Sequence, residues 1–394
     1  MKEAGIYVHI PFCKSRCRYC DFNTSAGMEH FIPEYFSSLE KEIKIYGERY
    51  ASLYAIRSIY AGGGTPSYLA AGTIPRVIQE IKRSFHVTTD VEISVEANPA
   101  DITMEKCREW THAGVRRMSI GMQSAQEGEL QMLGRRHCFA DVVRAVEQVR
   151  SAGMTNFNLD LMFGLPHQSM KDWQDSVKKA MLLQPAHLSL YALTVEEGTP
   201  LAIDMDAGLL PAPDDDLAAD MYEWATDFLA TQGFEQYEIS NWAKQDGVNY
   251  HCQHNLLYWR NQDYFGFGAS AHSHFGARRW ANLNGIQPYV KGIALYSAGE
   301  EAGFPWLETN TALSVADDMG ETAMMGLRLT QEGLRDDLFQ ERFGISLFRV
   351  YEKQIAELVD IGLLEVVSGD MSAIRLTKRG RMVGNQVFLR FLMV

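Results

Sequence analysis

The sequence predicts an α/β protein, a partial (β/α)6 TIM-like barrel followed by a small, mostly helical C-terminal domain. Three observations support this prediction. Short runs of β-branched and aromatic residues alternate with longer amphipathic stretches, which is typical of a parallel sheet with helical crossovers. Chemically active side chains gather just after the predicted strands, where the loops of a barrel converge. Beyond about residue 235 the alternation stops, and a helical pattern resumes only after residue 310.

Six strand–helix units follow one another in the first part of the chain. The predicted strands cover residues 6–10, 57–61, 91–95, 116–120, 156–161 and 187–191. The predicted helices cover residues 33–47, 73–84, 103–113, 139–152, 169–183 and 214–232. The acidic run "PDDD" at 213–216 is typical of a helix start, because carboxylates are favourable near the amino end of a helix. Six successive units predict a parallel sheet, either open or curled into an incomplete barrel.

The chain divides into three segments. We expect residues 1–235 to form the βα core, and residues 236–300 to form a connecting region rich in aromatic residues and histidine, without a clear period. Residues 301–394 would form the C-terminal domain, with a short hairpin at 363–377.

Composition and charge narrow the classes of partner. The chain has 394 residues and a formal net charge of −13, whereas nucleic-acid binding requires clustered Lys and Arg, so we expect no nucleic-acid partner. No apolar run approaches the roughly 20 residues of a transmembrane helix. The initial "MKEAGIYVHI" lacks the long apolar region and cleavage site of a secretory signal. We therefore expect a cytoplasmic protein with no transmembrane segment.

Three of the six cysteines lie in one stretch, "HIPFCKSRCRYCDF", which begins at residue 9. In a reducing compartment, the compact triplet of Cys13, Cys17 and Cys20 indicates metal binding rather than disulfides. Three thiolates can hold three irons of a 4Fe–4S cluster and leave the fourth iron open to a ligand. The alternative is zinc with His9 or Asp21 as fourth ligand, although structural zinc commonly uses two separated ligand pairs. The basic residues between the cysteines would favour ionised thiols.

Glycine and polar residues follow four more of the predicted strands. The run "AGGGTP" (61–66) follows the second strand, Glu96 ends the third, Gln123 follows the fourth, and Asp160 lies near the end of the fifth. Because the carboxyl ends of barrel strands open onto one mouth, we expect these groups to share a site with the cysteines. Taken singly, Glu96 or Asp160 is explained as well by a helix cap or a structural hydrogen bond.

At these positions the sequence resembles a known family. The stretch "CKSRCRYC" is similar to the CxxxCxxC signature of the radical S-adenosylmethionine (SAM) superfamily. The stretches "YVHIPFC", "GGGTPSYL", "SVEANP", "SIGMQS", "LGRRH" and "DLMFGLP" resemble the subgroup around oxygen-independent coproporphyrinogen III dehydrogenase. The resemblance runs from about residue 7 into the C-terminal domain, and it implies a radical SAM core in residues 1–235. In that family a reduced cluster donates one electron to SAM, which releases methionine and a 5′-deoxyadenosyl radical.

The resemblance also assigns roles to individual residues. The cluster ligands would be Cys13, Cys17 and Cys20. The SAM on the cluster would be lined by Tyr7, Gly63 and Glu96. In the dehydrogenase a second SAM is held by residues that correspond to Tyr19, Gly64, Thr65, Gln123, Arg135 and Asp160.

Two departures from the dehydrogenase indicate a different branch of the subgroup. Phe22 stands where the dehydrogenase has a further cysteine, and the twelve residues before Cys13 are too few to supply that enzyme's N-terminal extension. In both respects the sequence resembles the HemW-type haem chaperones. The segment "HNLLYW" is similar to the HNxxYW segment of that group, with His254 as the candidate axial ligand. The residues thereby assigned to haem are His254, Asn255, Tyr258 and Trp259.

The same aromatic region has a second interpretation, a packed loop whose histidines make structural hydrogen bonds. We expect that structural role for His251, Cys252, His272 and His274.

The sequence therefore predicts a radical SAM-type haem chaperone that binds a 4Fe–4S cluster, SAM and haem, and passes haem to an unidentified acceptor protein. The alternative is an oxygen-independent coproporphyrinogen III oxidase, which decarboxylates its substrate oxidatively to protoporphyrinogen IX. A zinc-stabilised interaction module is a third and weaker alternative.

Overall fold

The computed structural model describes residues 1–297, 303–367, 369 and 372–392. Across these residues, a central sheet of twelve strands has the order β14-β13-β12-β11-β1-β4-β5-β6-β7-β8-β10-β9. Six of its strands are neighbours in sequence order and run parallel. They are β1 (Lys2–Ile10), β4 (Tyr54–Gly63), β5 (His86–Ala97), β6 (Arg117–Gln123), β7 (Asn156–Phe163) and β8 (His187–Ala192). The six predicted strands are thus confirmed.

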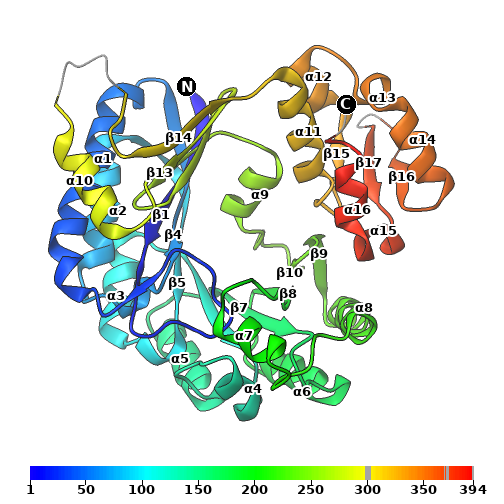
Figure 1. The fold of residues 1–394 in the computed structure, drawn as a ribbon, viewed down its shortest axis with the longest axis horizontal. Helices are drawn as coiled ribbons and strands as arrows, with labels where there is room; N and C mark the ends of the chain where they lie inside the picture. The colour runs from blue at the N-terminus through cyan, green and yellow to red at the C-terminus, as the bar shows by residue number, and fades with distance from the viewer. Residues whose placement is uncertain (298–302, 368, 370–371, 393–394) are drawn as a thin grey trace.

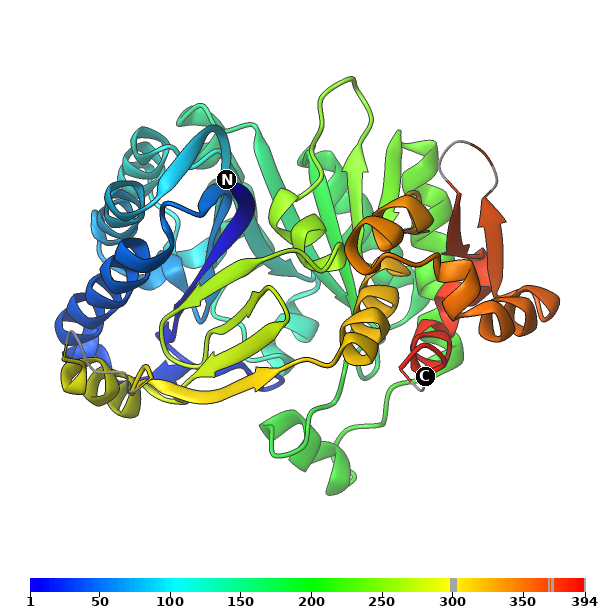
Figure 2. The same cartoon turned by 90° about the horizontal axis from the view of Figure 1, so that it is seen from above.

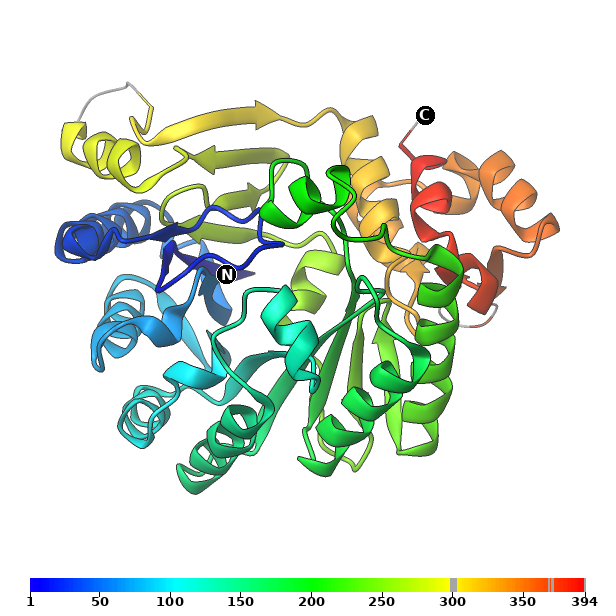
Figure 3. The same ribbon diagram turned by 60° about the horizontal axis from the view of Figure 1, so that its bottom comes forward.

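Helices follow each of these strands and lie in an arc on the outer side of the sheet (Figure 3). The long ones are α1 (Ile32–Tyr50), α2 (Thr73–Ser84), α3 (Met104–Ala113), α5 (Phe139–Ser151), α6 (Met170–Leu182) and α8 (Asp215–Thr231), and the short ones are α4 (Glu127–Met132) and α7 (Pro200–Asp206). Side-chain caps explain several of the helix starts. Thr103 accepts a hydrogen bond from the Lys106 backbone N–H, and Asp214 accepts one from that of Leu217.

The inner strands have near-continuous apolar faces because helices cover one side and the barrel interior lies on the other. One buried cluster joins strands and helices, with Ile6, Ile59 and Val95 from the strands and Leu39 and Ile78 from the helices. Burial on both sides accounts for the strong sequence signal of these six units.

The region without a clear sequence period adds short strands to both sides of the parallel core. On one side are β10 (Asn241–Lys244) and β9 (Phe234–Glu238). On the other side are β11 (Tyr264–Phe267), which is parallel to β1, and the antiparallel β12 (His272–Phe275), β13 (Arg278–Asn282) and β14 (Leu307–Ala312). Helix α10 (Ile286–Leu295) packs against α1. The sequence pattern did not predict these strands, because most have only four or five residues.

Helix α9 (Gln253–Trp259) lies in the opening of the curved sheet (Figure 1). It contacts β1, β4 and α11 (Val315–Gly326). A second parallel pair, β2 (Phe12–Cys13) and β3 (Ser25–Ala26), frames the cysteine loop that follows β1.

The C-terminal elements lie to one side of the barrel (Figure 2) and have a core of their own. After α11 they are β15 (Leu334–Arg335), α12 (Asp336–Phe343), α13 (Leu347–Val350), α14 (Glu352–Asp360), β16 (Leu364–Val367), β17 (Ala373–Leu376), α15 (Lys378–Met382) and α16 (Gly384–Leu389). Strands β16 and β17 form the predicted hairpin, and residues 368, 370 and 371 of its turn lie outside the described residues. In the described part of the chain, no helix has the length and apolar character needed to cross a membrane.

Candidate functional site

The cysteine loop is held to the carboxyl end of the sheet by backbone hydrogen bonds. Gly64 donates its N–H to the Ile10 carbonyl at 2.7 Å, and Thr65 donates to that of Phe12 at 2.9 Å. The Thr65 hydroxyl thereby lies 3.3 Å from the Cys13 sulfur. At Gly64 a Cβ would come within 2.7 Å of the Ile10 carbonyl oxygen, so the close approach of the two loops requires glycine.

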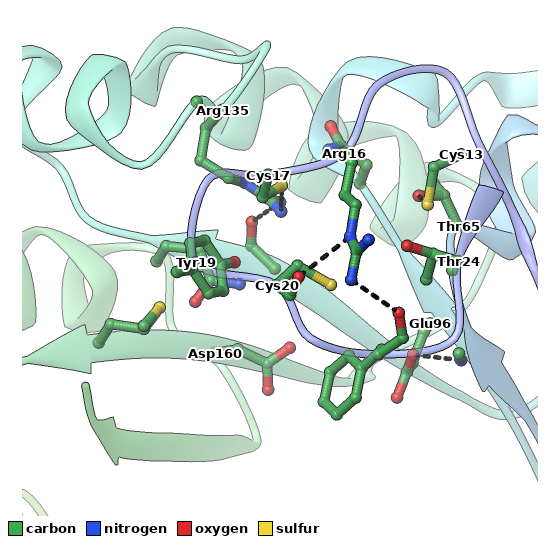
Figure 4. Close-up of a pocket in the computed structure, with 18 of the residues that line it drawn as sticks. Cys13, Arg16, Cys17, Tyr19, Cys20, Thr24, Thr65, Glu96, Arg135 and Asp160 are labelled. Carbon is green, nitrogen blue, oxygen red and sulfur yellow. Dashed lines mark hydrogen bonds between the residues drawn. The ribbon is translucent and has the colours of Figure 1, made fainter. Parts of the chain in front are cut away.

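The three cysteines line one cavity of about 580 Å3, which we call the cysteine cavity. Figure 4 shows their side chains arranged around the loop, above the ends of the strands that carry Glu96 and Asp160. Of the nine residues that the resemblance assigns to SAM, eight line this cavity: Tyr19, Gly63, Gly64, Thr65, Glu96, Gln123, Arg135 and Asp160. The strand-end groups and the cysteines therefore line the same cavity, and their shared function stays a prediction.

Burial raises the pKa of the Cys13 and Cys20 thiols. We expected the basic residues of the loop to oppose this effect. Arg16 does so at Cys20, whose pKa its charge lowers, and it donates to the backbone carbonyl of Cys20 at 3.0 Å. Arg18 forms an ion pair with Asp204 of α7.

The guanidinium that touches a thiol comes from outside the loop. Arg135 Nη1 donates to the Cys17 sulfur at 3.4 Å, and its Nη2 donates to the Gly121 carbonyl at 2.8 Å. The third guanidinium nitrogen of Arg135, Nε, is buried without a partner among the described residues. A buried donor at the edge of a cavity fits a site that receives a polar or anionic ligand.

Neither fourth ligand considered for zinc is suitably placed. The His9 ring uses both nitrogens, since Nε2 donates to the Asn23 carbonyl at 2.8 Å and Nδ1 accepts from the Tyr7 hydroxyl at 3.1 Å. Asp21 is exposed. Among the described residues, no three His, Cys, Asp or Glu side chains are grouped so that they could hold a single metal ion.

Glu96 lies deep in the barrel, and its carboxylate faces the cavities. It accepts hydrogen bonds from the Tyr60 hydroxyl at 2.8 Å and from the Gly63 N–H at 3.2 Å. Burial raises the pKa of Glu96 to about 7, and these hydrogen bonds only partly oppose the rise. Gly63 has a φ of 107°, and a Cβ there would meet the His9 ring, so this turn also requires glycine.

Asp160 also lines the cysteine cavity. It accepts hydrogen bonds from the Ser119 hydroxyl at 3.1 Å and from the Asn158 side-chain amide at 2.6 Å. Burial again raises the carboxyl pKa. Gln123, at the end of β6, has a φ of 62°, a left-handed conformation that non-glycine residues adopt mainly at tight turns and functional sites.

A smaller cavity of about 210 Å3, the inner cavity, lies between the sheet and α9. It shares Glu96, Ser119 and Tyr191 with the cysteine cavity. The predicted residues that line it are Tyr7, Glu96, His254, Asn255 and Tyr258. Its volume is below the roughly 300–1,000 Å3 of typical cofactor pockets.

His254, the candidate axial ligand, is fully packed. Only 1% of its surface is exposed, Nδ1 lies 2.9 Å from the Ser58 hydroxyl, and Nε2 lies 2.9 Å from the Tyr258 hydroxyl. Burial and the nearby Arg117 lower the pKa of His254 to about 3, so the ring is neutral. It would have to give up one of these two hydrogen bonds in order to bind iron.

Trp259 does not line either of these cavities. Its ring packs under the Arg328 guanidinium, which lies 4.3 Å from the ring centroid. Trp259 therefore joins α9 to the C-terminal elements.

Sequence reasoning missed Arg117 and Glu92. Arg117 is 2% exposed in the middle of the barrel and lines the inner cavity. Glu92 accepts a hydrogen bond from the Gln253 N–H at 3.0 Å and thereby holds the start of α9. The available signal was the presence of charged residues within otherwise apolar strands, where a charge needs a partner.

Comparison with known proteins identifies the family. The model of the Radical SAM superfamily matches residues 7–180, and that of the HemN C-terminal domain matches residues 313–383. The "Heme chaperone HemW" of Bacillus subtilis is 37% identical over 393 residues, which cover 100% of this chain and 99% of that protein. The protein of the same name from Lactococcus lactis is 33% identical over 392 residues and covers 100% and 98% of the two chains.

Among solved structures, the coproporphyrinogen III oxidase HemN of Escherichia coli, described as a radical SAM enzyme, superposes with a TM-score of 0.82. It is 24% identical, and the match covers 100% of this chain and 90% of that chain, which confirms the predicted fold. The fold and the cysteine site thus define a protein of the radical SAM class. Within that class, the chain belongs to the HemW-type family, as the sequence resemblance predicted.

Proposed function

We propose that the protein is a haem chaperone that binds a 4Fe–4S cluster, SAM and haem, and that passes haem to an acceptor protein. The observation that carries this proposal is the cysteine cavity, which three thiols line together with eight residues of the expected SAM set. The whole-length similarity to proteins named "Heme chaperone HemW" supports haem as the cargo.

The residues of the cysteine cavity fit a cluster and SAM. Cys13, Cys17 and Cys20 supply the soft thiolate ligands that iron–sulfur clusters require. The unpartnered Nε of Arg135 and the thiol contact of its Nη1 offer two donors to an anionic group in the cavity. When bound, a reduced cluster supplies one electron to SAM.

The surrounding residues hold and orient these groups. Glu96, with a pKa near 7, offers an acceptor to a cationic group, and the approach of such a group would favour the ionised carboxylate. Asp160 offers a second acceptor in the same cavity. Tyr7 lies behind Glu96, in the inner cavity, and supports the orientation of His9 rather than the walls of the cysteine cavity.

The net charge of −13 favours a protein acceptor over nucleic acid. We infer a cytoplasmic location, consistent with thiols that must stay reduced to bind iron. The acceptor would approach the open mouth of the barrel, because haem has to leave through it.

The test is a pair of assays on one anaerobic preparation with a reconstituted cluster. Haem titration is expected to give a saturable Soret shift, and incubation with coproporphyrinogen III, SAM and reductant is expected to give no decarboxylation. Turnover of coproporphyrinogen, or the absence of saturable haem binding, would contradict the proposal.

A further inference from the structure

A third cavity, of about 340 Å3, opens beside the cysteine loop and adjoins the two cavities described above. We call it the side cavity. Phe22 of the cysteine loop, Tyr258 of α9, Tyr264 of β11 and His272 of β12 contribute to its wall. It shares Phe22, Gly63 and Glu96 with the cysteine cavity.

His272 lines the side cavity, and its ring is available to a ligand. It is exposed, and within the described part of the chain its imidazole makes no hydrogen bond. His9 also lines the side cavity, but both of its ring nitrogens are engaged. In the inner cavity, His254 is likewise fully paired. An iron ligand needs a free imidazole nitrogen, and His272 meets this requirement.

The backbone that presents His272 is rigidly held. The turn before it contains Gly268 and Ser270, with φ of 100° and 56°. The Gly268 N–H donates to Glu42 at 2.9 Å, and its carbonyl accepts from the Asn282 side chain at 2.9 Å. A strained turn that is held by several hydrogen bonds is typical of a functional position.

Phe22 contributes an aromatic ring to the wall of the side cavity. Its ring is 65% exposed although it belongs to the ordered cysteine loop, and the Arg16 guanidinium donates to its carbonyl at 3.4 Å. An exposed aromatic ring at the rim of a cavity offers a flat apolar face to a flat ligand.

The phenols in the wall are poor competitors for iron. The Tyr258 hydroxyl is bound to His254, and the Tyr264 hydroxyl accepts a hydrogen bond from Arg279 at 3.4 Å. Burial raises the pKa of both phenols, which disfavours the phenolate that would bind ferric iron.

We propose that His272 is the axial ligand of the haem iron, and that one edge of the porphyrin enters the side cavity against Phe22. This inference rests on the haem-chaperone function proposed above. It assigns iron binding to His272, for which the sequence indicated a structural role, and no longer to His254.

Haem that is held by one protein ligand, His272, beside an open cavity can be transferred readily to the acceptor protein. The iron face opposite His272 stays accessible to a side chain of the acceptor protein. That side chain binds the iron, and the His272–iron bond then breaks. The step is a ligand exchange in which the iron keeps its oxidation state, so it requires no oxidant or reductant.

The test is titration of ferric haem into the full chain with a reconstituted cluster, followed by difference absorption and EPR of the haem. Compared with wild type, His272→Ala is expected to weaken haem binding at least tenfold and to shift the Soret band. His272→Gly with added imidazole is expected to regain the wild-type spectrum, which a merely structural role would not produce. His86→Ala, at an exposed histidine that begins β5 and lines none of the three cavities, is the matched control.

The outcomes separate the two proposals. If the wild type shows no saturable haem binding, the haem-chaperone function itself fails. If the wild type binds haem and His272→Ala binds it equally well with the same spectrum, only the present inference fails. If His254→Gln loses the Soret band of bound haem and His272→Ala keeps it, the iron ligand is His254 on α9.

Discussion

The cysteine cavity and helix α9 carry the two strongest motifs of the sequence, yet they differ in how their polar groups are paired. In the cysteine cavity, the Arg135 Nε is buried without a partner among the described residues, and the three cysteines form no disulfide. On α9, His254 has a partner on each ring nitrogen.

The difference shows how a motif that binds a ligand can be told from a motif that only supports the fold. A buried polar group is costly unless it is paired, so a site that awaits a ligand leaves its donors open, whereas a packed motif pairs them. By this criterion, the cysteine cavity fits a ligand site better than the position of His254 on α9 does.

Substitution of a cysteine is the most direct test of whether the cysteine cavity is a ligand site. Cys17→Ala is expected to reduce the iron of the anaerobically reconstituted protein from about four atoms per chain to a background level, because two thiolates cannot retain the cluster. Iron analysis and EPR after reduction measure the effect. Cys138→Ala, at the start of α5 and outside the cavity, is the control and should retain the iron. Full iron in Cys17→Ala would mean that the cavity is not the cluster site.

Arg117 tests whether the interior beneath α9 is architectural. Arg117→Met removes a buried cation that faces Glu92, Glu96 and Asp160, and we expect a loss of roughly 3–5 kcal/mol in the free energy of unfolding. Urea denaturation measures it. Arg57→Met on β4 removes ion pairs whose arginine side chain is 47% exposed, and should cost about 0–1 kcal/mol. Equal effects would contradict the architectural role.

The pH dependence of stability sharpens the assignment of His254. Its pKa is about 3 in the folded protein, below the roughly 6.5 of an exposed imidazole. Between these values the unfolded chain binds more protons, so this contribution to stability is lost as the pH falls below about 6.5. His254→Gln should lose stability less steeply over that window, by up to about 1.4 kcal/mol per pH unit. An unchanged slope would indicate that His254 is not buried as a neutral ring.

Trp259 provides the smallest test. Trp259→Phe keeps an aromatic ring beneath Arg328 and removes an indole N–H that is buried without a partner among the described residues. We expect a change within about 1 kcal/mol in unfolding free energy and an unchanged Soret spectrum. A large spectral change would show that Trp259 contacts haem.

Much of the fold and part of the site were predictable from sequence. The six parallel strands and their helices have continuous apolar runs and amphipathic periods, because each is buried on a known face. Spacing identified the cysteine triplet, and position at strand ends identified Glu96, Gln123 and Asp160 as its companions. These features depend on local order along the chain, and barrel geometry then brings the strand ends together.

The tertiary structure alone decided which polar groups are paired. The sequence separated His254 from His272 only by the resemblance of "HNLLYW" to a segment of the HemW-type group, and it does not show which of the two rings is paired. Their difference arises because Ser58 comes from a distant strand to meet His254, whereas His272 ends a strained turn at the edge of an open cavity. Pairing across such separations depends on packing in three dimensions, and so the availability of a side chain for a ligand becomes visible only in the folded protein.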